Sequence, residues 1–84
     1  MKRTEDLSAI AYLSPGTLDH SSTYHVELHS SVLDYPRVAH FSGSGRTPEQ
    51  IRDFIMNFTR LTLSVCLQLR LHEKDISVKI VDLA

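Results

Sequence analysis

The chain has 84 residues, which leaves room for one hydrophobic core and excludes a second domain. Hydrophobic residues make up 42% of the chain and charged residues 23%, which matches globular domains and excludes the composition of a disordered segment. Nine lysines and arginines nearly balance ten acidic residues, and this balance excludes the strongly basic field that drives non-specific nucleic-acid binding. We therefore expect residues 1–84 to form a single α+β domain.

The first half of the chain predicts a β-hairpin over residues 23–42. Apolar and polar residues alternate from Thr23 to His29, as they do in a half-buried strand. Pro36 fixes its own φ angle and favours a turn, after which residues 37–42 fit a returning strand. Residues 7–13 fit either a short strand or one or two helical turns, because this window is too short for periodicity to decide.

The clearest local signal is the start of a helix. Thr47 is a suitable N-cap, Pro48 suits the first helical position, and Gln50 completes a capping box. Residues 61–71 also alternate as a strand would, so the alternative is a short helix followed by a second hairpin. We favour one long helix over about residues 48–72, because no Gly or Pro interrupts it and leucine prefers helix to strand.

The last element and the single cysteine complete the predicted fold. Residues 76–83 are β-branched and alternating, which predicts a closing strand, so we expect an antiparallel sheet packed against the long helix. Cys66 cannot form an internal disulfide, and we expect it to be a small buried apolar residue. The apolar run 7–13 is too short for a signal-peptide core or a membrane span. These features predict a cytoplasmic protein that is neither secreted nor embedded in a membrane.

The histidines suggest a metal site, but their spacing argues against one. His25, Glu27 and His29 share one face of the predicted strand. Residues four apart on a strand are separated by about 13 Å, so His25 and His29 cannot bind the same ion. A site would need His20 or His40 to be brought in from a neighbouring segment. We predict no metal, no cofactor and no catalytic residue, since residues 41–45 also lack the pattern of a nucleophile elbow.

The far side of the predicted helix carries the strongest indication of function. Ile51, Phe54, Ile55, Phe58, Leu61, Val65 and Leu69 follow the periodicity of a helix, and all of these except Leu61 are expected to pack on the sheet. The residues expected on the opposite side, and predicted to bind a partner, are Arg52, Met56, Arg60, Leu63, Leu67, Arg70 and Leu71. Methionine and arginine are enriched at protein interfaces and lysine is depleted there. If residues 61–71 form a strand instead, these leucines belong to the core.

These patterns predict a small non-enzymatic regulator or inhibitor that binds another protein. A homodimer is the simplest partner, because one self-complementary surface is sufficient. The predicted order of elements resembles, in topology alone, small regulatory proteins, antitoxin-like modules and phage-borne inhibitors, which suggests a phage- or mobile-element-type modulator of a host protein. The alternative is a nucleic-acid-associated module, antitoxin-like or binding RNA or DNA, in which Arg37, Arg46, Arg52 and Lys74 contact phosphates.

Overall fold

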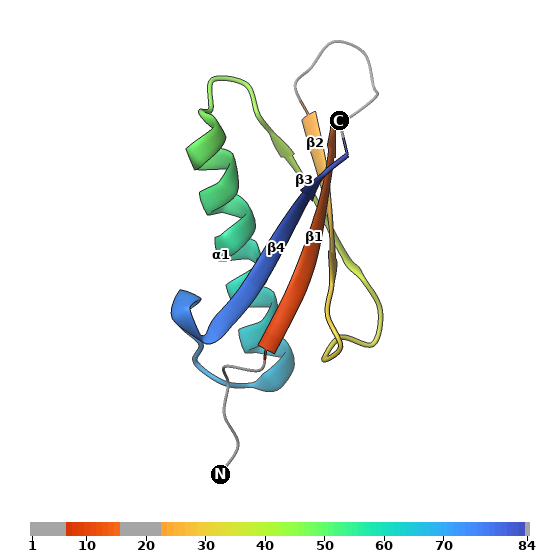
Figure 1. The fold of residues 1–84 in the computed structure, drawn as a ribbon, viewed down its shortest axis with the longest axis vertical. Helices are drawn as coiled ribbons and strands as arrows, with labels where there is room; N and C mark the ends of the chain where they lie inside the picture. Colours follow the sequence, from red (N-terminus) through yellow and green to blue (C-terminus); the bar gives the residue numbers. More distant parts are fainter. Residues whose placement is uncertain (1–6, 16–22, 84) are drawn as a thin grey trace.

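Three strands, one helix and a fourth strand follow one another along the chain (Figure 1). The computed structural model describes residues 7–15 and 23–83. The elements are β1 (Leu7–Pro15), β2 (Thr23–His29), β3 (Arg37–Ser42), α1 (Pro48–Leu67), the short 3-10 helix η2 (Glu73–Asp75) and β4 (Ile76–Asp82). The predicted hairpin and the closing strand are therefore confirmed, and residues 7–13, which the pattern left open, belong to a strand.

The four strands form one mixed sheet in the order β3-β2-β1-β4. β1 pairs with β2 and β2 with β3 in antiparallel fashion, whereas β1 and β4 run parallel. The prediction of a purely antiparallel sheet is therefore wrong. The reason is the path of α1, which runs back along the sheet so that β4 starts at the same end of the sheet as β1 (Figure 1). A crossover connection of this kind produces parallel pairing.

Helix α1 begins as predicted and ends earlier than predicted. The Thr47 hydroxyl accepts a hydrogen bond from the Gln50 amide at 3.2 Å, and the Gln50 side chain accepts one from the Thr47 amide at 2.9 Å. The helix ends at Leu67 rather than at residue 72, because Gln68 adopts a left-handed conformation with φ of 56°. The helical interpretation thus holds for residues 61–67. No helix in the described parts of the chain is long and apolar enough to cross a membrane.

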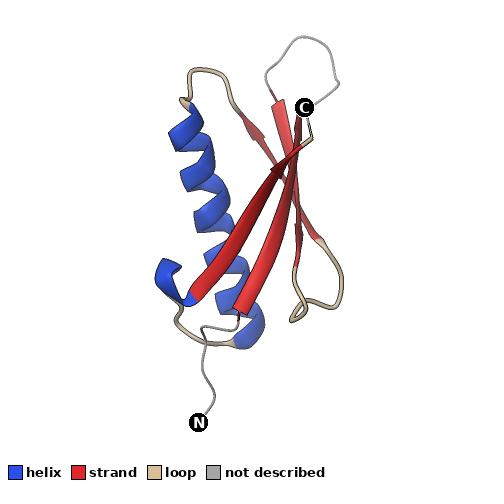
Figure 2. Ribbon diagram, viewed as in Figure 1, coloured by secondary structure: helices blue, strands red, loops and turns tan. Residues whose placement is uncertain are grey.

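The core lies between α1 and one face of the sheet, and within residues 7–15 and 23–83 no helix covers the opposite face (Figure 2). Alternation along the strands directs every second residue toward α1. The buried core residues are Ala9, Ala11, Leu13, Val26, Leu28, Phe41, Ile55, Leu63, Leu71 and Ile76. At one end of the core the Phe41 ring lies 4.2 Å from Phe54 and 5.5 Å from Tyr24, measured between ring centroids.

Candidate functional site

The open face of the sheet carries a pair of histidines. His25 and His40 are cross-strand partners on β2 and β3, and Nδ1 of His25 lies 3.1 Å from Nε2 of His40. The two rings meet edge to face with centroids 4.8 Å apart. In residues 7–15 and 23–83 no group of three or more His, Cys, Asp or Glu side chains is placed to hold a metal ion. His20 lies outside the described residues.

His29 makes its contacts with different neighbours on the same face. Its Nε2 atom lies 3.2 Å from a carboxylate oxygen of Glu27, and its ring meets the Tyr12 ring edge to face at 5.2 Å. Both members of the Glu27–His29 pair are more than 40% exposed, and ion pairs at such positions contribute little to stability. On the open face, His25, His29 and His40 thus each have a neighbour from the same sheet.

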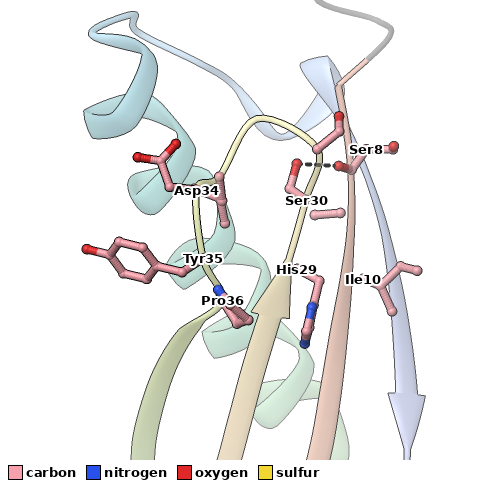
Figure 3. Close-up of a pocket in the computed structure, with 10 residues that line it drawn as sticks. Ser8, Ile10, His29, Ser30, Asp34, Tyr35 and Pro36 are labelled. Carbon is pink, nitrogen blue, oxygen red and sulfur yellow. Dashed lines mark hydrogen bonds between the residues drawn. The ribbon is translucent and has the colours of Figure 1, made fainter.

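A hollow beside the connection between β2 and β3 contains hydroxyl, imidazole and carboxylate groups (Figure 3). The Ser30 hydroxyl donates a hydrogen bond to the Ser8 carbonyl at 2.7 Å, and the ring of His29 faces Glu27 and Tyr12. The side chains of Asp34 and Tyr35 point away from His29 (Figure 3). These residues therefore do not assemble the nucleophile, base and orienting acid that acyl transfer requires.

The structure does not form the partner-binding stripe that the sequence predicts on α1. Leu63 and Leu71 are 0% and 2% exposed and belong to the core, and Leu67 is half-buried against it. Met56 and Arg60 are half-buried, whereas Arg52 and Arg70 are exposed. The prediction of an exposed stripe is wrong, because the chain turns at Gln68 and Leu71 enters the same buried core as Leu63.

Ser64 lies in the same part of α1 and offers a direct test of this packing. Its hydroxyl oxygen is buried and has no hydrogen-bond partner. A buried hydroxyl without a partner is unfavourable, and alanine is the better helix former. We expect Ser64→Ala to raise the free energy of unfolding by about 1 kcal/mol, measured by urea denaturation. Ser77→Ala, at an exposed position of β4, is the control and should change little; a loss of stability in Ser64→Ala would contradict the burial of the hydroxyl.

The exposed apolar surface lies instead on the side of α1 that faces β3. Leu61 is 49% exposed and Val65 is 76% exposed. Val38 of β3 borders this surface and is 50% exposed, but as the partner of Glu27 it directs its side chain to the open face of the sheet. We call this surface the β3 flank, and the residues that line its groove are Arg37, Val38, Phe58, Leu61, Thr62, Val65 and Cys66. The prediction that Val65 and Leu69 pack on the sheet is therefore wrong, since Leu69 is also 50% exposed.

Cys66 belongs to the β3 flank and is exposed, so the prediction that it is buried is wrong. Its thiol donates a hydrogen bond to the carbonyl of Val32 at 3.4 Å, which joins the last turn of α1 to the connection between β2 and β3. Cys66 lies among the regularly spaced apolar residues of the helix, and this spacing alone does not indicate that the groove beside it is exposed to solvent.

The backbone of β3 forms one border of the flank. Among the described strands β3 pairs only with β2, so it is an edge of the sheet. Edge strands often carry lysine, proline or a bulge that discourages further pairing. β3 has no lysine, proline or bulge, and its register with β2 is continuous from Arg37 to Ser42. Its one charged side chain, Arg37, is at its first residue.

The four basic residues of the nucleic-acid alternative are divided between two ends of the molecule. Arg46 and Arg52 line one hollow near the start of α1 together with Asp82. Lys74 lies in η2, beyond the other end of the helix, whose 20 residues span about 30 Å. Arg37 donates to the Tyr35 carbonyl at 2.8 Å and lies over the Tyr35 ring. The structure brings Arg46 and Arg52 together but does not gather all four into one patch.

Comparisons of the chain with protein-family models, with curated proteins and with solved structures found no match. Function is therefore inferred from the surfaces of the molecule. Among them, the β3 flank combines exposed apolar side chains with an edge strand.

Proposed function

We propose that this chain is a small non-enzymatic regulator or inhibitor that acts by binding a protein through the β3 flank. The supporting observation is the clustering of exposed apolar residues. Seven large apolar side chains are exposed in the described residues, and two of them, Leu61 and Val65, lie together on α1 beside the groove. Val38 borders the groove from β3, although alternation directs its side chain to the open face of the sheet. Scattered exposed apolar residues need no explanation, but a cluster of them is typical of an interaction surface.

The position of the groove beside an edge strand defines the chemistry of the partner. An added strand can donate to and accept from the outward backbone groups of β3, and its alternate side chains can contact the helix. On the helix side it meets Phe58, Leu61 and Val65, which are all apolar. The partner is therefore a protein that presents an extended segment with apolar side chains on one face.

The charges around the groove favour burial of this surface. Of the seven residues that line it, Arg37 alone is charged. Its guanidinium already has a hydrogen bond to the Tyr35 carbonyl and lies 4.1 Å from the centroid of the Tyr35 ring. Burying an unpaired charge is costly, so a surface whose only charge is already engaged can be covered at a small penalty.

The test compares the full chain with two variants of α1 as tagged baits in lysate of its host, with and without nuclease treatment. Val65→Asp places a charge in the groove, at a residue that is 76% exposed and therefore tolerant of substitution. We expect retention of the bound protein, including untagged copies of the chain, to fall at least about tenfold. Mass spectrometry of the retained proteins measures this change.

The matched control is Asn57→Asp, which adds the same charge at an exposed position of α1 outside the groove. Its carboxylate can still accept the hydrogen bond that Arg60 donates to the Asn57 side chain at 2.7 Å. We expect Asn57→Asp to retain what the unmodified chain retains. Equal retention by Val65→Asp, or retention that disappears on nuclease treatment, would reject the proposed function.

A further inference from the structure

We infer that the protein bound at the β3 flank is a second copy of this chain, joined by antiparallel pairing of two β3 strands about a two-fold axis. This inference rests on the proposed function and names its partner. Two copies related by a two-fold axis contact each other through the same patch of residues. One self-complementary patch is therefore sufficient, and the assembly is closed at two copies. The result is an eight-stranded sheet with both helices on the same face, since the axis is perpendicular to the sheet.

The backbone of β3 supplies the first argument. A strand paired antiparallel with its own copy meets an identical set of donors and acceptors, related by the two-fold axis. β3 is six residues long and contains no proline. Every residue whose backbone groups face the outer edge can therefore donate a hydrogen bond from its N–H group and accept one at its carbonyl oxygen. Its regular register with β2 means that the outer edge is also regular. A second β3 is thus a strand of the required length and conformation.

The position of the apolar side chains supplies the second argument. Leu61 and Val65 lie one helical turn apart on the side of α1 that borders β3. Pairing across the axis directs this side of each helix toward the same side of the other helix. Each copy therefore covers the exposed Leu61 and Val65 of its partner while its β3 covers the partner's edge. A short peptide strand could form hydrogen bonds with the edge of β3, but it would leave part of the apolar surface of α1 exposed to water.

The charge of the flank supplies the third argument. Two identical surfaces repel one another when they carry clustered charge of one sign, and they cannot gain from opposite charges unless both signs are present. The β3 flank carries one charge, on Arg37, and it is engaged by Tyr35 within the same chain. The whole chain has a formal net charge of −1, so long-range repulsion between copies is also small.

The other edge of the sheet does not meet the same conditions. β4 carries Lys79 at its centre, and lysine on an edge strand opposes pairing. Pairing of β3 with β4 of another copy would be heterologous and would extend into an open chain of molecules. The described part of the structure therefore favours a closed β3–β3 dimer over a fibre.

The first experiment measures the mass of the purified full chain by light scattering during size exclusion, over a range of concentrations. We expect a shift from 9.5 kDa toward twice this mass as the concentration rises. Val65→Asp should raise the concentration at the midpoint at least about tenfold, and Asn57→Asp should leave it unchanged. Circular dichroism checks that each variant is folded. A mass of 9.5 kDa at all concentrations, or growth beyond a dimer, overturns the inference.

The second experiment locates the contact by amide hydrogen exchange at low and high protein concentration. We expect exchange in β3 to slow as the dimer forms, with β4 unchanged. If the amides of β4 or β1 become protected as the dimer forms and those of β3 do not, the inference is overturned. If the chain stays monomeric while Val65→Asp still loses a different protein in the lysate experiment, the partner inference fails and the proposed function stands.

Discussion

Replacing Leu63 by alanine should lower the free energy of unfolding by about 2–5 kcal/mol, because it removes a fully buried side chain and leaves a cavity. Leu63 is 0% exposed and lies in the same core cluster as Ile55 and Leu71. A domain of this size has a total stability of only about 5–10 kcal/mol, so the variant should be partly unfolded in mild urea. Urea denaturation at one fixed protein concentration measures the effect, since self-association would add stability.

The control for Leu63 is Val65→Ala, two residues along the same helix. Val65 is 76% exposed in the monomer, so at a protein concentration too low for self-association its truncation should change the free energy of unfolding by no more than about 0.5 kcal/mol. The contrast decides which side of α1 faces the core. If Leu63→Ala were as stable as Val65→Ala, Leu63 would be a surface residue and the stripe predicted from the sequence would be correct.

Replacing Phe41 by alanine should cost about 3–5 kcal/mol of unfolding free energy. Its ring is 8% exposed and lies between Tyr24 and Phe54, with centroid distances of 5.5 and 4.2 Å. The substitution removes the contacts that hold β3 to the first half of α1. In a domain this small, the loss should lower the midpoint of thermal unfolding by about 12 °C or more. Differential scanning calorimetry measures this midpoint.

Two variants separate this effect from a general loss of aromatic residues. Phe41→Leu keeps most of the apolar volume and should cost about 1.5 kcal/mol or less. Tyr35→Ala removes an aromatic side chain that is 61% exposed, so it should change stability little despite the contact with Arg37. A Phe41→Ala variant that unfolds at the same temperature as Tyr35→Ala would show that the aromatic cluster does not stabilise the core.

The sequence was most informative where the signal is local. The alternation of Thr23 to His29 and the turn at Pro36 predicted the hairpin, and Thr47 with Pro48 predicted the first residue of α1. The end of α1 was not predictable in the same way, because helices commonly end at glycine or asparagine and this one ends at Gln68. The parallel pairing of β1 with β4 depends on the path of the chain between them, and the sequence of neither strand indicates this path.

The candidate site was misassigned because α1 is apolar on both of its flanks. Leu61 and Val65 form one row, and Leu63 and Leu67 form another, so helical periodicity predicts either as the buried one. The segment that follows the helix distinguishes the rows, since the chain turns at Gln68 and Leu71 joins Leu63 in the buried core, with Leu67 packed against this core. The first row then stays exposed next to β3. Only the tertiary position of residues 68–76 distinguishes the two rows.

The pairing of β1 with β4 has a consequence for the order of events during synthesis. β1 lies inside the finished sheet, yet Ile10 pairs with Lys79, at the far end of the described chain. A nascent chain that has left the ribosome as far as α1 can form the three-stranded meander, but one border of β1 still has no strand beside it. Contacts this distant in sequence are slow to form. We expect folding to finish only after β4 has been made, and a chain stalled before β4 to be the aggregation-prone species.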